Sequence, residues 1–302
     1  MTDDGGLTGL DVVPWGALHH AYGSAIDVPD QLRGLRSPER DTRHAALNQL
    51  SGNVYHQGTR WQASCHTVRF LVALVDDPAT PDRASVLGLL RAVGVGDRRD
   101  DHLPFRPDRT FADADAVGDE QLAELIRWLY HGDDPYADDT MTDLGDAAAL
   151  RWDADSFRAA AEHTDRYARW VGDTDPEVAA RAAELLAWFA PTDAAVTALL
   201  MVPADPVRAP VRASANLTLA HLDTEAVGIE HRLRELLTTP PPAVHVTAAV
   251  ALAYRLGDRL PDRALDILIR AGEQDPPPES PPGWDRSVRG FVALSLQRLG
   301  LT

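Results

Sequence analysis

The chain has no lysine: its 302 residues include 29 bases, and all of them are arginine. A P-loop needs lysine to reach the phosphates of a nucleotide, and pyridoxal phosphate enzymes need it to form a Schiff base. The absence of lysine therefore excludes most nucleotide enzymes and the pyridoxal phosphate enzymes. No motif for another cofactor is present, so we expect the protein to use none.

Cysteine and long apolar runs are almost absent as well. The single cysteine, Cys65, has no partner for an internal disulfide, which fits a reducing compartment. No apolar run approaches the ~18 residues of a membrane span, and the acidic amino terminus has no signal-peptide pattern. We therefore expect a cytoplasmic protein that does not interact with membranes.

Basic charge is in the minority. The 46 acidic residues against 29 basic ones give a net charge of −17. A field of this sign repels phosphate backbones unless the arginines gather on one face, and here they are scattered and often adjoin aspartates. We expect no nucleic-acid partner, and a DNA glycosylase is disfavoured for the same reason.

The carboxyl half contains a repeated helical sequence. Residues 175–189 match two later segments at successive shifts of 33 residues, and a fourth copy spans residues 287–300. The matching positions are Val178, Val211 and Val244, then Ala182, Ala215 and Ala248, then Leu186, Leu219 and Leu252. Such a period is typical of stacked helix pairs. We therefore predict an all-α fold, a right-handed α-solenoid of antiparallel helix pairs, with the three alanines buried.

Helical periodicity places the individual helices. In residues 176–189 the apolar side chains recur at the spacing of one helix face, and Asp175 followed by Pro176 is a typical helix start. Similar patterns predict helices at residues 37–50, 63–75, 82–93, 120–130, 193–201, 225–237, 261–271 and 287–300. No segment has the alternation of a β-strand, so we expect no sheet.

Residues 97–150 interrupt the helical pattern. They are rich in aspartate around the one helix predicted at residues 120–130. Like charges at this density oppose collapse into a core. We expect amino-terminal repeats at 1–96, a partly flexible acidic insertion at 97–150, and carboxyl-terminal repeats at 151–302, with all parts forming one continuous solenoid. We also expect residues 97–146 to be dispensable for folding.

The repeated segment resembles a known family. Residues 175–186 follow the pattern D-P-x-V-x-x-x-A-x-x-L-L, which is similar to the second helix of a HEAT repeat. The segments WGALHHAYGSA at 15–25, DVP at 27–29 and NVYHQGTRW at 53–61 look like the start of a group of actinobacterial HEAT-repeat proteins. The resemblance implies a scaffold, because most HEAT-repeat proteins bind other molecules and few are enzymes.

Three patterns raise the question of metal binding or catalysis. Residues 133–139 resemble the aspartate-rich Mg²⁺ motif of class I terpene synthases, but Pro135 interrupts its helix and the second metal motif fails at Asn216. The 11 histidines lack the spacing of a metal site, so we expect no metal. Cys65 lies in a predicted amphipathic helix, where a cysteine is usually a core residue rather than a nucleophile.

The polar segment HQGTRW at residues 56–61 is one candidate binding site. It places His56, Arg60 and Trp61 at a predicted turn between helices, where a rigid scaffold can present polar groups. The alternative is that the segment only forms a turn and caps the following helix.

A second candidate site is a column of rings. On the helix at 176–189, Trp188 lies on the face opposite the predicted core, and the equivalent residues of the next two repeats are His221 and Tyr254. Beside them Glu184 is followed by Leu217 and Val250, so this outward face becomes apolar. An exposed stripe of this kind marks a partner or ligand surface, unless the solenoid or a loop covers it.

These observations lead to two hypotheses about function. The first is a non-enzymatic HEAT-repeat scaffold that binds a protein or peptide in its concave groove. The second is a HEAT-like enzyme of bacterial specialised metabolism that acts on a small molecule in the same groove. A closed pocket where the rings meet acidic residues of the insertion favours the enzyme, and a long open groove favours the scaffold.

Overall fold

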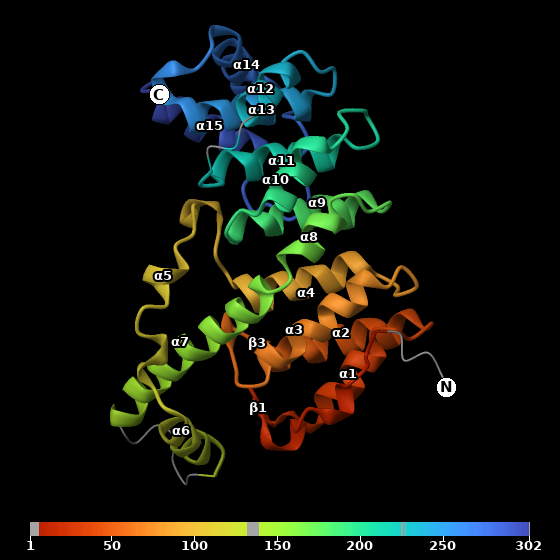
Figure 1. Ribbon diagram of the computed structural model, residues 1–302, viewed down its shortest axis with the longest axis vertical. Coiled ribbons are helices and arrows are strands. Elements are labelled where there is room, and N and C mark those ends of the chain that lie inside the picture. Colours follow the sequence, from red (N-terminus) through yellow and green to blue (C-terminus); the bar gives the residue numbers. More distant parts are fainter. Residues whose placement is uncertain (1–5, 132–138, 225, 227, 302) are drawn as a thin grey trace. The chain divides into compact units, whose positions relative to one another are not determined.

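The computed structural model describes residues 6–131, 139–224, 226 and 228–301, and these residues are mostly helical (Figure 1). The chain divides into two compact units. The amino-terminal unit contains residues 1–97 and 106–163, and the carboxyl-terminal unit contains residues 98–105 and 164–302. In the described part of the chain, every helix is too short or too polar to span a bilayer.

Two layers of helices and two small hairpins make up the amino-terminal unit. The helices are α1 (Val28–Gly34), α2 (Arg40–Val54), α3 (Ser64–Asp76), α4 (Arg83–Val95), α5 (Pro107–Thr110), α6 (Asp119–His131) and α7 (Asp139–Ala161). Helix α3 packs against α4 and α7, α4 also packs against α7, and α1 packs against α2. The predicted helices at 63–75, 82–93 and 120–130 are therefore confirmed.

The absence of β-structure is a prediction that proves wrong on a small scale. Strands β1 (His19–His20) and β2 (Gly23–Ser24) form one antiparallel hairpin, and β3 (Tyr55–His56) and β4 (Thr59–Arg60) form another. Each strand has two residues, which is too short for an alternating pattern. The second turn uses positive φ angles at Gln57 (49°) and Gly58 (85°), as a two-residue hairpin turn requires.

Part of the predicted acidic insertion packs into the core of the amino-terminal unit. Phe111, Ala114 and Val117 are buried, and the Phe111 ring lies 5.5 Å from that of Phe157 in α7. Helix α7, which has 23 residues, was not predicted from the sequence, because its many alanines and aspartates leave no clear apolar stripe. The expectation that charge keeps this stretch from collapsing is wrong for these residues, because the apolar side chains between the aspartates are buried.

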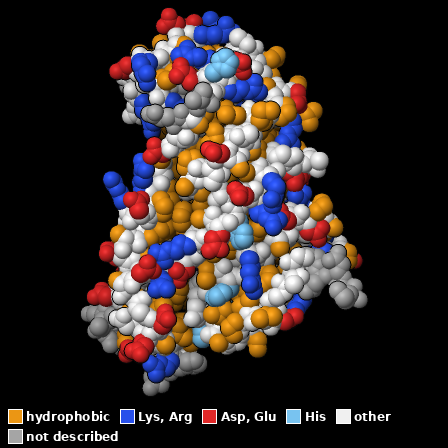
Figure 2. Space-filling view, in the orientation of Figure 1, with side chains coloured by type: hydrophobic (Ala, Val, Ile, Leu, Met, Phe, Trp, Pro, Cys, Tyr) orange, Lys and Arg blue, Asp and Glu red, His pale blue; other side chains and the backbone are white. Residues whose placement is uncertain are grey.

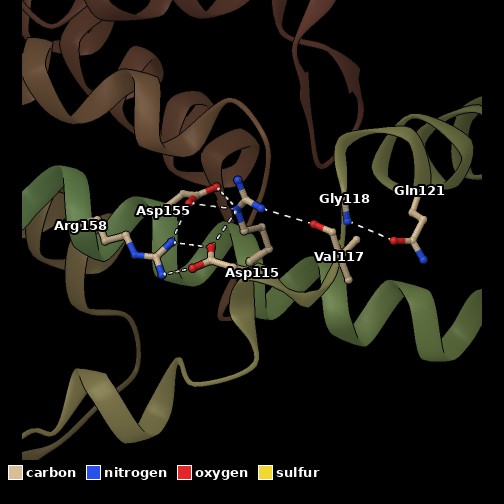
Figure 3. Close-up of polar contacts among 7 residues, drawn as sticks. Asp115, Val117, Gly118, Gln121, Asp155 and Arg158 are labelled. Carbon is tan, nitrogen blue, oxygen red and sulfur yellow. Dashed lines mark hydrogen bonds and ion pairs between the residues drawn. The ribbon is translucent and has the colours of Figure 1, made fainter.

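Two arginines of α7, Arg151 and Arg158, form ion pairs with Asp155 of the same helix and with Asp115 of the segment before α6 (Figure 3). Arg158 makes a two-point ion pair with Asp115, with both N–O distances at 2.9 Å, and this contact lowers the pKa of the Asp115 carboxyl. Asp155 pairs with Arg151 at 3.0 Å, and Arg151 Nη1 donates to the Val117 carbonyl at 3.3 Å. Residues 133–138 of the terpene-synthase-like motif lie outside the described residues.

The carboxyl-terminal unit is a stack of helices. Its helices are α8 (Thr164–Trp170), α9 (Pro176–Leu185), α10 (Asp193–Met201), α11 (Ala209–His221), α12 (Ile229–Leu236), α13 (Pro242–Leu256), α14 (Asp262–Glu273) and α15 (Val288–Arg298). The odd-numbered helices form one row in which α11 packs between α9 and α13, and α13 packs against α15. Helix α10 packs against α11, α12 packs against α13, and α14 packs against α13 and α15. These even-numbered helices lie beside the first row (Figure 1).

The repeat register is visible in the packing of the row α9, α11 and α13. Ala182, Ala215 and Ala248 each have no exposed surface, as the sequence predicts. Asp175 caps α9 by accepting a hydrogen bond from the Glu177 amide at 2.9 Å. Small side chains at equivalent positions let the helix axes approach closely. The predicted helix at 176–189 ends earlier than expected, because its last turn, Leu186–Trp188, is a 3-10 helix.

Buried hydroxyl and amide groups join neighbouring helices of the row. Ser214 and Thr218 of α11 donate to the carbonyls of Ala180 and Ala183 in α9, at 2.7 and 2.6 Å. On the other side of α11, Asn216 donates to the Val244 carbonyl of α13 at 3.1 Å. These bonds satisfy polar groups that have no contact with water, and they fix the register between the helices.

Arginines cap the carboxyl ends of helices within this unit. Arg255 donates to the carbonyls of Leu219 and Leu222 at the end of α11. Arg212, which is fully buried, donates to the Leu199 carbonyl at the end of α10 at 2.6 Å, and burial lowers its pKa to about 9. The last carbonyls of a helix lack intrahelical partners, so a guanidinium is a suitable cap. In this chain without lysine, arginine side chains therefore supply the cationic hydrogen-bond donors that cap these helix ends.

Candidate functional site

The predicted ring column lies in the carboxyl-terminal unit, but it is not an exposed stripe. Trp188 is 2% exposed and His221 is 6% exposed, whereas Tyr254 is half-buried. The His221 and Tyr254 rings are in edge-to-face contact at 5.1 Å, and Trp188 instead contacts Phe105 at 6.3 Å. The structure therefore joins two members of the column, and of the two alternatives that the sequence left open, the covered one holds for Trp188 and His221.

The neighbouring positions are buried too. Leu217 and Val250 have no exposed surface, and Glu184 is 2% exposed. The Glu184 carboxylate accepts a hydrogen bond from the Trp188 indole at 2.6 Å. The sequence does not reveal what covers these residues.

The cover is a proline-rich segment between α14 and α15, residues 274–287, which we call the strap. Trp284 of the strap is 9% exposed. Its indole donates to the Ser214 hydroxyl of α11 at 3.0 Å, and its ring stacks on His221 with centroids 5.9 Å apart. At Gly283, an added Cβ would lie 3.2 Å from the Glu184 Cβ, so the strap backbone runs close to α9. The strap thus lies on α9 and α11.

An ion pair holds the strap at its carboxyl end. Arg286 donates to Asp100 at 2.6 Å, and the Asp100 side chain is 4% exposed. Asp100 lies in residues 98–105, which belong to this unit. The contact raises the pKa of the Arg286 guanidinium. A carboxylate buried to this degree requires such a partner.

Two polar atoms near Trp284 have no hydrogen-bond partner among the described residues. They are His221 Nε2 and the Tyr254 hydroxyl, and both atoms are buried. A buried polar atom without a partner costs about 1–3 kcal/mol, so most proteins avoid such atoms. Both atoms therefore retain the capacity to form a hydrogen bond.

Burial also determines the protonation of these groups. Desolvation, with a smaller contribution from Arg298, lowers the pKa of His221 to about 4. Desolvation raises the pKa of Tyr254, and the Arg298 guanidinium lies 3.9 Å above the ring centroid. Both side chains are neutral near pH 7. The arrangement therefore suits hydrogen bonding to a neutral polar group rather than proton transfer.

The other predicted site residues lie in the amino-terminal unit and have mainly structural contacts. Arg60 is 4% exposed and forms an ion pair with Asp153 of α7, and Trp61 stacks on Trp152 of the same helix at 5.7 Å. His56 is half-buried and its Nδ1 lies 3.2 Å from the Tyr22 hydroxyl. The segment is the β3–β4 hairpin, so the alternative reading as a turn accounts for Arg60 and Trp61.

Sequence reasoning missed a polar network beside this hairpin. The Asp27 carboxylate contacts His20 Nε2 at 2.9 Å and accepts from Gln31 at 2.8 Å and Asn53 at 3.0 Å. It lies at an open pocket of about 660 Å³ that Tyr22 also lines. The signal available in the sequence was the unusual polarity of residues 19–31. Because the buried His20, Gln31 and Asn53 side chains each pair with the exposed Asp27, we interpret the network as a structural link between the β1–β2 hairpin, α1 and α2.

Cys65 and metal binding can be judged from the same structure. Burial, with a smaller effect of Asp155, raises the pKa of the Cys65 thiol to about 12, so the reactive thiolate is scarce at neutral pH. Among the described residues, no group of three or more histidine, cysteine or acidic side chains is arranged to hold a metal ion.

Figure 2 shows acidic and basic side chains interspersed over the face drawn, in agreement with the scattered arginines of the sequence.

Comparison with family models, with curated proteins and with solved structures finds no match to this chain. The site itself is therefore the source of any functional argument. The sequence analysis did not identify Trp284 as a residue of this site. A tryptophan at the end of a loop with five prolines, residues 276–278 and 281–282, was the feature that could have indicated it.

Proposed function

We propose that the chain is a non-enzymatic helical-repeat scaffold, a right-handed α-solenoid of the HEAT type, that binds a peptide segment of a protein partner along α9, α11 and α13. The sequence period of 33 residues and the equivalent burial of Ala182, Ala215 and Ala248 support the repeat assignment. We call the surface formed by these three helices under the strap the groove.

One observation carries the proposal: the groove already accommodates a proline-rich stretch of polypeptide that turns at Pro282 and Gly283. The strap contacts α9 through Gly283 and α11 through Trp284, with an aromatic anchor and one hydrogen bond to a buried hydroxyl. A large ring seated among buried side chains is the usual form of a hot spot in peptide recognition. A surface that holds one such peptide is suited to hold another.

A small-molecule enzyme in the same groove is the less supported alternative. Such an enzyme needs an acid or base that titrates near neutral pH. The site is covered, and Asp100 of the predicted insertion acts on Tyr254, which is the arrangement expected of an enzyme, but this carboxylate is paired with Arg286 at 2.6 Å. The groove otherwise offers His221 with a pKa of about 4 and Tyr254 with a pKa raised by desolvation. Neither group meets that requirement, whereas both can form hydrogen bonds with a peptide.

The proposal is tested with a library of displayed peptides, selected against the purified full chain. Enriched peptides are then measured by fluorescence anisotropy against the wild type and a His221→Phe, Tyr254→Phe double variant. We expect the double variant to bind at least ~10-fold more weakly, because one or two hydrogen bonds are lost. Tyr22→Phe, at an exposed tyrosine of the other unit, is the control. Equal affinity for the wild type and the double variant contradicts binding in the groove.

A further inference from the structure

The strap differs from a structural loop in how it is attached. In the described part of the chain, no backbone hydrogen bond joins residues 275–286 to α9, α11 or α13. Proline has no amide hydrogen, so a proline-rich segment cannot form a ladder with its neighbours. Its side-chain contacts include the Trp284 indole on Ser214, the Trp284 ring against His221 and against Phe291 of α15, and the Arg286 pair with Asp100. The Ser280 hydroxyl also accepts a hydrogen bond from the Val288 amide at 3.0 Å. Side chains therefore provide the anchors, with Trp284 and Arg286 the two that reach α11 and residues 98–105.

The strap also leaves its seat incompletely satisfied. The His221 ring, which stacks on Trp284, has a buried Nε2 without a hydrogen-bond partner among the described residues. The Tyr254 ring touches His221, and its buried hydroxyl has no such partner either. Native packing normally pairs such atoms. A peptide with a carbonyl or amide at this point makes hydrogen bonds that the strap does not make, and it therefore competes with the strap.

From these observations we infer that the strap is an intramolecular ligand of the groove, and that the partner is a proline-rich peptide with a tryptophan anchor, which displaces it. This inference rests on the proposed function. The strap sequence Pro281-Pro282-Gly283-Trp284 is the pattern that the groove recognises in the structure.

Competition makes the strap a brake on binding. While Trp284 occupies its seat, a partner binds only to the fraction of molecules in which the strap is released, and the observed affinity falls by that fraction. Removing the Trp284 side chain should therefore raise the observed affinity for the partner. The structure thus supplies a way to change affinity without altering the groove.

The test uses a fluorescent synthetic peptide of residues 275–287 and the full-length protein. Trp284→Ala is the released variant, and Asp285→Ala is the matched control, since Asp285 is an exposed neighbour in the strap. We expect the peptide to bind Trp284→Ala at least ~10-fold more tightly than it binds the wild type or the control. A peptide with alanine in place of its tryptophan should bind none of the proteins.

Stability measurements decide whether the strap is a ligand or part of the core. We expect Trp284→Ala to keep a single cooperative thermal transition, and Arg286→Gln, which releases the other anchor, to show the same gain in peptide affinity. Loss of the cooperative transition in both variants overturns the inference, because the strap is then core. Absence of peptide binding by folded Trp284→Ala also overturns it.

The two proposals fail in different ways. If peptides selected from the library bind the groove of folded Trp284→Ala while the strap peptide does not, the strap inference fails and the proposed function stands. If neither kind of peptide binds folded Trp284→Ala, both fail. If the strap peptide binds wild type and Trp284→Ala equally, the strap does not occupy the site and only the inference fails.

Discussion

Gly94 of α4 faces Ala160 of α7 so closely that a Cβ added to Gly94 would lie 2.6 Å from the Ala160 Cβ. Real Cβ atoms do not approach one another to this distance, so the glycine is required for the two helices to pack. Gly88 lies one and a half turns earlier in the same helix, and an added Cβ there meets nothing within 4 Å.

This pair of glycines gives the first prediction. Gly94→Ala should lower the free energy of unfolding by about 1–3 kcal/mol, because the methyl group forces α4 away from α7. Gly88→Ala should raise it by about 0.5–1 kcal/mol, because alanine favours the helix at an unobstructed position. Urea denaturation of both variants measures the two values. If Gly94→Ala is as stable as Gly88→Ala, the contact between α4 and α7 is wrong.

The second prediction concerns the segment that the sequence presents as an acidic insertion. Phe111 is 6% exposed and packs on Phe157, so Phe111→Ala should cost about 3–5 kcal/mol of unfolding free energy. Asp113→Ala, at an exposed neighbour, should change it by less than about 0.5 kcal/mol. Thermal and urea unfolding of the two variants compares them. A stable Phe111→Ala variant would support the original expectation that this stretch is dispensable.

These residues show what the sequence can and cannot predict. The period that brings Ala182, Ala215 and Ala248 into equivalent positions is local and is confirmed by their burial. Helix α7 was missed because alanine and aspartate carry little periodic signal, although its packing against α3 and α4 makes it central to its unit. Local pattern thus predicts helices whose apolar stripe is strong and misses those stabilised mainly by tertiary contacts.

The candidate site was predicted to a smaller extent. Helical periodicity singled out Trp188, His221 and Tyr254 as one column, and two of these rings are in contact. Their cover depends on a contact between Trp284 and Ser214, which are 70 residues apart in the sequence. No periodic pattern encodes a contact of this range, so the sequence left the covered and exposed alternatives open.

The third prediction concerns pH. The His221 pKa is lowered from an ordinary value of 6.5 to about 4 in the folded protein. Between these values the unfolded chain binds more protons than the folded one, so stability is complete above about pH 6.5 and decreases as the pH falls toward about 4. The shift corresponds to roughly 3 kcal/mol at most.

Urea unfolding at several pH values tests this contribution. Relative to the wild type, His221→Phe should lack this loss of stability between about pH 6.5 and pH 4, because it keeps a ring against Trp284 and cannot bind a proton. His231→Gln, at an exposed histidine, should follow the wild type. Parallel pH curves for the wild type and His221→Phe would show that His221 titrates normally and is not buried under Trp284.

The last prediction separates binding from stability at Tyr254. The buried hydroxyl of this residue has no hydrogen-bond partner among the described residues, so Tyr254→Phe removes an unsatisfied group and keeps the ring between His221 and Arg298. The unfolding free energy should stay the same or rise by about 1 kcal/mol, since the desolvated hydroxyl contributes no bond in the free protein. In the Trp284→Ala background, affinity for a groove peptide should fall about 5- to 10-fold, because the peptide loses a hydrogen bond of about 1 kcal/mol or slightly more. Urea unfolding and peptide anisotropy on the same protein preparation measure both quantities. A fall in stability with unchanged affinity is the opposite result, and it would assign the hydroxyl to the fold and remove Tyr254 from the binding surface.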